Sequence, residues 1–513
     1  MDLGNLNLEQ KIGQLFLVAV NGQSVESGTR EHFSKYPFGN FILFARNLKD
    51  YKRVRCFIDD LQSIAKQVSG IPAFISLDQE GGMVHRVRSG ATHFPASMAI
   101  AASNISHVCE MGRIKGLELR RLGFNINHAP VVDVNNNPKN PVIGIRSYSD
   151  DPATVAKIAV QYIKGLQSSK VIANAKHFPG HGDTNLDSHL ALPVIEHTMD
   201  RLNAIELLPF KEAIASGVDA IMAAHIIFKA LDEKFPATLS HKVITELLRK
   251  ELKFDGLVLT DCLSMDAVRR HYTMEKGCVL AINAGVDLLC LCTDYDVQIS
   301  CYDAVLEAVK NGEILIAKID AAVERILKYK KKYACGEAEP EPMESYPVHE
   351  QLADEISKKS ITLVKGGDLL PLSGKTFFAI SPIPEPSSVA DDEVENLDSF
   401  AKSICPHHAE ISINPSEWEI NEIVSKIEGY EIIVYAVYNA IQNPGQVELY
   451  KALKDAGKQI VLVLLRAPYD LTQMRDADVQ VVAYEYTRRS VENTIAALFG
   501  KAEFLGMLPI KSF

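Results

Sequence analysis

The sequence predicts an α/β protein: a (β/α)8 barrel of the TIM type in the first two thirds of the chain, followed by a smaller α/β domain. Three observations support this prediction. Eight short apolar runs alternate with longer segments of helical period. An acidic, proline-rich segment comes next. A second, shorter alternation of apolar runs and helical segments then occupies the rest of the chain.

The eight apolar runs have the composition of strands that are buried on both faces. They are short and rich in Val, Ile, Leu and Phe, which is typical of parallel strands. In chain order they are LFLVAV (15–20), FILF (41–44), AFISL (73–77), FNINHAP (124–130), VIANAKHF (171–178), AIMAAHIIF (220–228), GLVLTDCL (256–263) and DLLCLC (287–292). Helical segments such as TVAKIAVQYIKGLQSS and LSHKVITELLRKEL lie between them. Eight is the number of parallel strands that closes a TIM-type barrel.

The segment EAEPEPMESYPVHE predicts the domain boundary. It carries three prolines and five glutamates, which is typical of a solvated linker. We therefore predict a barrel domain over residues 1–335, a linker over 336–350 and a second domain over 351–513. The candidate strands of the second domain are TFFAIS (376–381), EIIVYAVY (431–438), QIVLVLL (459–465) and VQVVAYEY (479–486). Trp418 and Tyr438 are expected in its core.

Composition and charge exclude several classes of function. The 513 residues carry a formal net charge of -11, which argues against nucleic acid or an anionic membrane as the main partner. The N-terminal MDLGNLNLEQKIGQLFLVAV has no basic region, and no apolar run is long enough for a membrane span. The nine cysteines form no CxxC pair and are expected to be reduced thiols, mostly buried. These features predict a cytoplasmic protein; the oligomeric state is not encoded in them.

Polar residues follow the apolar runs at the end where a parallel barrel carries its functional groups. The carboxyl ends of barrel strands meet at one rim, so side chains distant in sequence come together there. Arg86 alone could be an ordinary ion-pair partner, and His225 alone could be a core histidine. Together, six ionisable side chains predict a functional site: Asp78, Arg86, Lys176, His177, His225 and Asp261.

The stretch KHFPGHGDTNLDSH (176–189) is the densest group of polar residues in the chain. His177 and His181 have the spacing of a helical zinc pair, but the proline and glycines around them disfavour a helix. The stretch also lacks the GxxxxGK[ST] order of a phosphate-binding loop. Acid–base chemistry is the favoured interpretation, because the Asp187 carboxylate can hydrogen-bond to the His189 imidazole and raise its basicity.

Four motifs resemble glycoside hydrolase family 3, in its NagZ-like β-N-acetylglucosaminidase branch. They are LDQEGGMVHR, NHAPVVDVNNNPKNPVIGIRSY, KHFPGHGDTNLDSH and LTDCLSM, and the resemblance covers about residues 8–330. SITLVKGGDLLPL (360–372) and YEYTRRSVENTIAALFGKAEFLGMLPI are similar to the start and the end of that family's second domain. The resemblance implies that the smaller domain is an α/β sandwich.

The resemblance also implies roles for ten residues. The catalytic residues would be Asp261 as nucleophile, His189 as acid/base and Asp187 as the carboxylate that orients His189. The substrate-binding residues would be Asp78, Arg86, Arg146, Lys176, His177, His225 and Met265. Two positions depart from the pattern of many relatives: Met83 stands in place of an arginine, and Cys262 in place of a second aspartate. Neither is a catalytic position, so we expect them to affect fine specificity.

The implied activity is that of a retaining, exo-acting β-N-acetylglucosaminidase that needs no cofactor or metal. It would remove terminal, non-reducing, β-linked N-acetylglucosamine (GlcNAc) through a covalent glycosyl-aspartate. The expected substrates are cell-wall muropeptides, in peptidoglycan recycling, or related GlcNAc oligosaccharides such as chitin fragments. A neutral imidazole repels phosphate less than a carboxylate does, so phosphorolysis stays open as a second reaction. β-Glucosidase or β-xylosidase activity, and a barrel that binds sugar without catalysis, are the rival functions.

Overall fold

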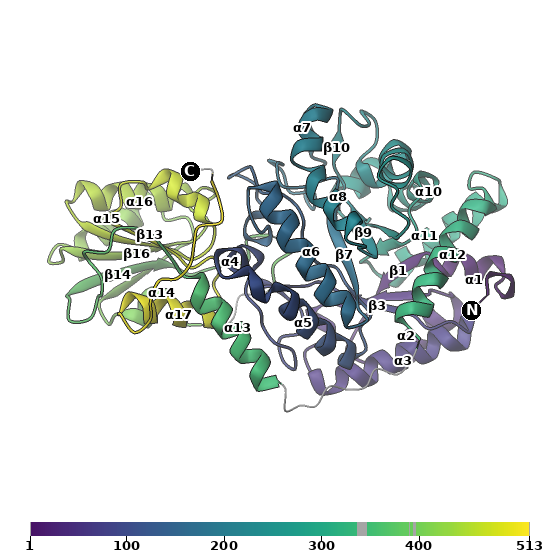
Figure 1. The fold of residues 1–513 in the computed structure, drawn as a ribbon, viewed down its shortest axis with the longest axis horizontal. Helices are drawn as coiled ribbons and strands as arrows, with labels where there is room; N and C mark the ends of the chain where they lie inside the picture. Colours follow the sequence, from purple (N-terminus) through teal and green to yellow (C-terminus); the bar gives the residue numbers. More distant parts are fainter. Residues whose placement is uncertain (1, 336–345, 389, 393–396, 512–513) are drawn as a thin grey trace.

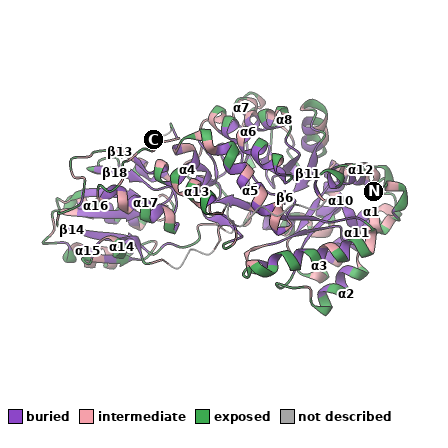
Figure 2. Cartoon of the chain, turned by 60° about the horizontal axis from the view of Figure 1, so that its bottom comes forward, coloured by how far each residue is buried: buried purple, intermediate pink, exposed green. Residues whose placement is uncertain are grey.

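The computed structural model describes residues 2–335, 346–388, 390–392 and 397–511. Figure 1 shows two units side by side along the long axis, a barrel that contains the N-terminus and a smaller unit formed by the C-terminal part of the chain. Figure 2 shows that the strands of both units are largely buried, whereas the helices expose one face to solvent. Both predicted units are therefore present.

Seven of the eight predicted apolar runs contain a strand of one parallel sheet, and the run FILF (41–44) overlaps a strand that begins one residue earlier. The strands are β1 (Phe16–Ala19), β2 (Asn40–Ile42), β3 (Phe74–Leu77), β6 (Ile126–Asn127), β7 (Ile172–Phe178), β9 (Ala220–Ala223), β11 (Leu257–Thr260) and β12 (Leu289–Leu291). Their order is β11-β9-β7-β6-β3-β2-β1-β12. A parallel bridge between Leu259 and Leu288 joins β11 to β12 and brings the two ends of the sheet together. The predicted (β/α)8 barrel is confirmed.

Helices lie before, between and after these strands and cover the outside of the barrel (Figure 1). They are α1 (Leu8–Gln14), α2 (Ser27–Lys35), α3 (Tyr51–Ser69), α4 (Ser97–Ala102), α5 (Val108–Leu122), α6 (Pro152–Ser168), α7 (Met199–Ala204), α8 (Leu207–Ala215), the π-helix η6 (Lys242–Glu251), α9 (Asp266–Tyr272), α10 (Met274–Ala284), α11 (Tyr295–Lys310) and α12 (Ile316–Tyr333). Among the described residues, no helix combines the length and the apolar composition needed to cross a membrane.

Glycine sets the close approach of neighbouring barrel helices. A Cβ atom on Gly165 of α6 would lie 2.0 Å from the carbonyl oxygen of Cys109 in α5. Helix α6 begins at Pro152, and the preceding Asp151 side chain accepts a hydrogen bond from the backbone N–H of Thr154 at 3.0 Å. Proline in the first turn and aspartate at the N-cap are favourable positions for both residues.

The smaller unit is an α/β sandwich around a six-stranded sheet. Its strands are β13 (Thr362–Lys365), β14 (Phe377–Pro382), β15 (His408–Ile411), β16 (Ile432–Val437), β17 (Gln459–Leu464) and β18 (Val479–Val482). The order is β13-β18-β17-β16-β14-β15, and only the edge strand β13 pairs in antiparallel fashion. The helices are α13 (Tyr346–Ser360), α14 (Phe400–Ile404), α15 (Glu417–Lys426), α16 (Pro444–Asp455) and α17 (Arg488–Leu498). The second fold prediction is confirmed.

The sheet of the sandwich has a separate apolar core on each face. Tyr435 and Val437 of β16 pack in one core with α15 and α16, whereas Val434 and Ala436 pack in the other with α14 and α17. This alternation is typical of a sheet that is covered by helices on both faces. Tyr438 is buried, as predicted. The expectation for Trp418 was wrong, because its side chain lies on the solvent side of α15 and is 74% exposed.

The two units share an interface next to the rim of the barrel. Helix α4 contributes Met98 and Ala99 to the same apolar cluster as Tyr469 of the sandwich. The buried Glu485 carboxylate accepts a hydrogen bond from the backbone N–H of Ala96 at 2.6 Å. Helix α13 packs against both α4 and α17. Residues 336–345 of the predicted linker (336–350) lie outside the described residues, and residues 346–350 belong to α13.

Asp287 joins β11 to β12 at the seam of the barrel. Its fully buried carboxylate accepts a hydrogen bond from the backbone N–H of Val258 at 2.8 Å. It also pairs with Arg249 at 2.6 Å and with Arg325. A buried charge that loses its partner is strongly destabilising, so this carboxylate stabilises the seam.

We predict that Asp287→Asn lowers the free energy of unfolding by about 3 kcal/mol, because the guanidinium of Arg249 loses its charge partner. Urea or thermal unfolding measures the change. Asp59→Asn is the control: Asp59 pairs with Arg55 on the exposed surface of α3, where removal of a pair changes stability by less than about 1 kcal/mol. Equal free energies of unfolding for Asp287→Asn and Asp59→Asn would contradict the stabilising role of Asp287.

Candidate active site

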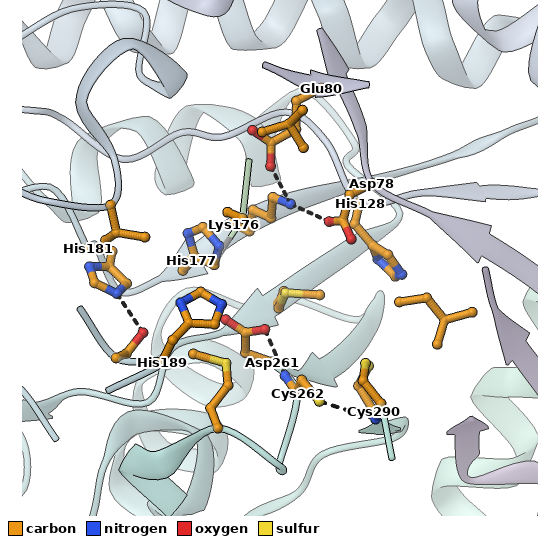
Figure 3. A pocket seen from close by; sticks show the side chains of 18 of the residues that line it. Asp78, Glu80, His128, Lys176, His177, His181, His189, Asp261, Cys262 and Cys290 are labelled. Atoms are coloured by element: carbon orange, nitrogen blue, oxygen red, sulfur yellow. Dashed lines mark hydrogen bonds and ion pairs between the residues drawn. The ribbon is translucent and has the colours of Figure 1, made fainter. Parts of the chain in front are cut away.

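A cavity of about 260 Å³ opens at the carboxyl ends of the barrel strands. Figure 3 shows side chains from several strand ends and loops pointing into it. Eight of the ten residues singled out in the sequence line the cavity: Asp78, Arg86, Arg146, Lys176, His177, His189, Asp261 and Met265. The other two, Asp187 and His225, lie directly behind lining residues.

A buried group of alternating charges forms one wall of the cavity. The Nζ atom of Lys176 lies 2.7 Å from Oδ1 of Asp78 and 2.7 Å from Oε1 of Glu80. Arg146 donates two hydrogen bonds to Glu80, at 2.9 Å from Nε and 2.8 Å from Nη2. Glu80 belongs to the motif LDQEGGMVHR, but its role was not predicted, because its partners, Arg146 after β6 and Lys176 in β7, are distant in sequence.

These charges keep one another ionised. Burial acts to raise the pKa of Glu80, but Arg146 and Lys176 lower it to about 2. Burial acts to raise the pKa of Asp78, but Lys176, His128 and Arg86 together lower it below its ordinary value. Burial acts to lower the pKa of Lys176, and the two carboxylates raise it above its ordinary value. All four side chains are therefore charged at neutral pH and offer strong hydrogen-bond donors and acceptors to a polar ligand.

Two hydrogen bonds from neighbouring elements of the barrel hold the backbone that carries Asp78 and Glu80. The Asn127 side chain at the end of β6 accepts a hydrogen bond from the backbone N–H of Gln79 at 2.9 Å. The buried Lys115 of α5 donates from Nζ to the carbonyl oxygen of Glu80 at 2.6 Å. Because both contacts are to the backbone, they position the two carboxylates independently of any ligand.

Asp133 orients His177 at the end of β7. Its fully buried carboxylate lies 2.7 Å from Nδ1 of His177 and accepts the backbone N–H groups of His177, at 3.1 Å, and of His181, at 2.7 Å. Burial acts to raise the pKa of Asp133, and His177 lowers it. Because the ionised carboxylate only accepts, Nδ1 of His177 carries the proton of this hydrogen bond. Asp133 belongs to one of the four motifs that carry the family resemblance, but no role was predicted for it.

His177 and His181, which have the sequence spacing of a helical zinc pair, form hydrogen bonds with other side chains of the protein. His177 contacts Asp133 through Nδ1, and the rings of His177 and His181 lie 5.7 Å apart at 75°. His181 uses Nδ1 for Thr184, at 3.0 Å, and Nε2 for Ser188, at 2.9 Å. Both ring nitrogens of His181 are thus occupied by hydroxyl groups. The structure supports the view that these histidines are not a zinc pair.

Asp187 and His189 form a close pair at the mouth of the cavity. Oδ1 of Asp187 lies 2.6 Å from Nδ1 of His189 and accepts its backbone N–H at 2.9 Å. Burial acts to lower the pKa of His189, but the hydrogen bond and charge of Asp187 raise it above the ordinary value. The side chain of His189 is 24% exposed, so Nε2 can exchange a proton with a ligand in the cavity.

Asp261 follows β11 and points into the same cavity, beside His189 (Figure 3). The backbone N–H of Cys262 donates to Oδ1 of Asp261 at 2.7 Å. Burial acts to raise the pKa of Asp261, but His177, His225 and His189 lower it to about 2. The carboxylate is therefore ionised over the whole physiological pH range.

His225 does not reach the cavity surface, which corrects the expectation that it lines the pocket. Its side chain is fully buried, and Nε2 lies 3.0 Å from the carbonyl oxygen of Cys262. Since a carbonyl only accepts, Nε2 carries the proton. Burial lowers the pKa of His225, so the ring is neutral and acts as a donor that fixes the backbone after Asp261.

The sandwich domain contributes to the cavity wall. Arg86 donates from Nη1 to Asp392 at 2.6 Å and from Nη2 to the carbonyl oxygen of Ala390 at 2.9 Å. Ala390 itself lines the cavity, and Asp392 also accepts the backbone N–H of His85 at 2.7 Å. Segment 390–392 of the sandwich domain therefore closes one side of the cavity and holds Arg86.

A group of polar side chains near the loop 180–190 has the composition of a cation site but not its charge balance. Asp183 lies 2.5 Å from Nε2 of His197, and Glu206 is nearby. The guanidinium of Arg201 lies 3.1 Å from Glu206 and 3.5 Å from Asp183. A fixed positive charge between the carboxylates occupies the position that a metal cation would take.

The cavity therefore combines an ionised carboxylate with an imidazole whose pKa is raised. Asp261 can attack an electrophilic carbon, and His189 can donate a proton to a leaving group and later accept one. Groups whose environments drive their pKa values apart are typical of acid–base and nucleophilic chemistry. The charged wall around Lys176 can bind the hydroxyl groups of a polar ligand.

Comparisons with known proteins agree with this chemistry. Residues 7–329 match the sequence model of the glycosyl hydrolase family 3 N-terminal domain. The β-hexosaminidase A of Pseudoalteromonas piscicida is 37% identical over 369 residues, which span 67% of this chain and 62% of that protein. The β-hexosaminidase of Haemophilus influenzae (strain PittEE) is 33% identical over 308 residues, 59% of this chain and 86% of the relative.

A solved structure extends the similarity to both domains. The family 3 β-N-acetylglucosaminidase from Paenibacillus sp. str. FPU-7 superposes with a TM-score of 0.91 at 37% identity, over 99% of each chain. The similarity therefore includes both the barrel and the sandwich. With the family match over most of the barrel, it shows that this chain belongs to glycosyl hydrolase family 3.

Proposed function

We propose that this protein is a retaining, exo-acting β-N-acetylglucosaminidase that removes terminal, non-reducing GlcNAc from a glycan. One observation carries the proposal: an ionised Asp261 and the Asp187–His189 pair line or border one cavity. The names of the relatives, β-hexosaminidase and β-N-acetylglucosaminidase, support the choice of sugar.

In the first step, Asp261 attacks the anomeric carbon of the bound sugar while the bond to the leaving oxygen breaks. Protonated His189 donates its Nε2 proton to that oxygen. Asp187 holds the ring through Nδ1 and stabilises the imidazolium before transfer. The product of this step is a covalent glycosyl-aspartate, and the aglycone leaves as a neutral alcohol.

In the second step, neutral His189 accepts a proton from water at Nε2 as the water oxygen attacks the anomeric carbon. The bond between that carbon and Asp261 breaks, so the carboxylate is regenerated and His189 is protonated again. Two inversions at the same carbon give net retention of configuration. No cofactor or metal takes part in the proposed cycle.

The charged wall supplies the groups that would bind the sugar. We assign Lys176, Asp78, Arg146 and His177 to the hydroxyl and N-acetyl groups, with Arg86 held at the edge by Asp392. Glu80 acts through Arg146 and Lys176, which it keeps in place. Met265 lines the cavity and offers an apolar contact, and His225 acts from behind Asp261 as a positioning residue.

The natural substrates that we propose are cell-wall muropeptides or related GlcNAc oligosaccharides. A role in peptidoglycan recycling and a cytoplasmic location remain predictions from the sequence. The proposed boundaries of the barrel and sandwich domains, residues 1–335 and 351–513, also remain predictions.

Asp261→Asn should abolish turnover, because an amide is a far weaker nucleophile than a carboxylate. Release of nitrophenol from a chromogenic β-N-acetylglucosaminide should fall by roughly 10⁴-fold or more. Asp59→Asn, on the exposed surface of α3, is the control and should retain full activity. Turnover that survives Asp261→Asn would move the nucleophile elsewhere. Release from a β-glucoside in place of the β-N-acetylglucosaminide would point to β-glucosidase activity.

Asp187→Asn should change the pH dependence of kcat/KM. In the wild type the raised pKa of His189 keeps the acid protonated above the ordinary value near 6.5, so activity persists to higher pH. Loss of Asp187 lowers that pKa, and the alkaline limb of the profile should move to lower pH while kcat falls by about 10²-fold.

Asp183→Asn is the matched control for the pH profile. Asp183 pairs with His197 in the same region of the chain but does not line the cavity. Its substitution should leave the alkaline limb in place. An unchanged limb in Asp187→Asn would show that His189 is not the acid.

The effect of phosphate on the rate and the products of the reaction distinguishes hydrolysis from phosphorolysis. We predict equal rates of sugar release in phosphate-free and phosphate-rich buffer, with free GlcNAc as the product, because Nε2 of His189 can activate water directly. Product analysis by NMR distinguishes GlcNAc from its 1-phosphate. Formation of the sugar 1-phosphate would establish phosphorolysis instead.

A further inference from the structure

Three cysteines meet on the floor of the cavity. Cys262 follows β11, Cys290 lies in β12 and Cys292 directly follows β12, so the barrel seam brings the three together. Their Sγ atoms all lie within 4.8 Å of one another, and those of Cys290 and Cys292 are 3.6 Å apart. The sequence shows only scattered cysteines, because Cys262 is 28 residues away from Cys290.

The sulfur spacing fits a thiophilic cation. Two sulfurs bound to one tetrahedral zinc ion, each at about 2.3 Å, are about 3.8 Å apart. Thiolates are the preferred ligands of soft metal ions, and a three-sulfur set leaves a fourth position open. All three cysteines line the cavity, and Cys262 and Cys292 are partly exposed, so an ion has a path to the site.

The sulfurs are also held in position by their surroundings. The backbone N–H of Cys292 donates to Sγ of Cys262 at 3.2 Å, and Oγ of Ser264 lies 2.9 Å from the same sulfur. The backbone N–H of Cys290 donates to Oγ1 of Thr260 at 2.9 Å. Hydrogen bonds to ligand atoms and to the backbone that carries them strengthen metal sites.

We propose that Cys262, Cys290 and Cys292 form a binding site for a thiophilic divalent cation such as Zn²⁺ or Cd²⁺. Binding displaces the thiol protons to solvent, forms three metal–sulfur bonds and leaves water in the fourth position. The ion sits beside Asp261, since the backbone N–H of Cys262 donates to that carboxylate. Its positive charge and its volume block attack on the sugar, so the site inhibits the enzyme. This consequence rests on the proposed function.

Cys262 supplies the third sulfur of the set. Cys262 stands at the position where the resemblance places aspartate in many relatives, next to the nucleophile. With aspartate at position 262, the sulfurs of Cys290 and Cys292 alone would remain in the set. The substitution completes a three-sulfur set without removing either backbone contact of residue 262 to Asp261 and His225.

Titration of the reduced full-length protein with Cd²⁺ tests binding without reference to activity. The ultraviolet charge-transfer band of cadmium thiolate should saturate at one equivalent. Cys292→Ser and, separately, Cys262→Ser should weaken binding by about 100-fold or more, since even outer contacts of metal ligands are worth 10–100-fold. Cys301→Ser removes a buried thiol elsewhere in the barrel and should leave the band unchanged. Identical titrations for all four proteins, or no saturable band, would overturn the site.

The second measurement is release of nitrophenol in the same titration. Wild type and Cys301→Ser should lose activity as the band saturates and regain it with EDTA, whereas Cys292→Ser should resist the same Cd²⁺ concentration. Saturable binding with undiminished turnover would overturn the inhibitory role. A metal-free protein that never turns over would instead overturn the proposed function while the binding result stands.

Discussion

The buried alternation of charges formed by Asp78, Lys176, Glu80 and Arg146 is the interaction on which the rest of the site depends. These four side chains come from β7 and from the segments that follow β3 and β6. Glu80, Lys176 and Arg146 are buried and Asp78 is half-buried, so the loss of a charge partner here would strongly destabilise the fold. The three segments can therefore adopt this arrangement only together. The charges are thus paired and held in place before any ligand arrives, which is the condition for strong electrostatic binding of a polar substrate.

The sandwich domain extends this constraint beyond the barrel. Asp392 holds Arg86, and Glu485 holds the backbone at Ala96, so the long segment after β3 lies between the two domains. That segment begins at Asp78. A shift of the sandwich domain relative to the barrel would therefore be transmitted to the charged wall through this one segment of the chain. This coupling explains why a domain with no ionisable group identified from sequence still shapes the cavity.

The sequence predicted features that depend on local pattern and missed those that depend on distant partners. The eight barrel strands were predictable because both faces are buried and the runs are uniformly apolar. Strands β13 and β15 are partly exposed and too polar to stand out. The Asp187–His189 pair could be inferred from adjacent positions. Glu80, Asp133 and Asp392 could not, because the residues that give them a role lie 44 to more than 300 positions away.

His189 and His225 both lie beside Asp261 but have different roles, because their environments differ. Both lower the pKa of that carboxylate, yet their own pKa values shift in opposite directions. His225 is sealed from solvent with a carbonyl as its partner, so it stays neutral and positions the backbone after Asp261. His189 has a carboxylate partner and partial exposure. It alone of the two can gain and lose a proton during a reaction. His189 can therefore transfer protons because its Nδ1 has a carboxylate partner and its ring has access to the cavity.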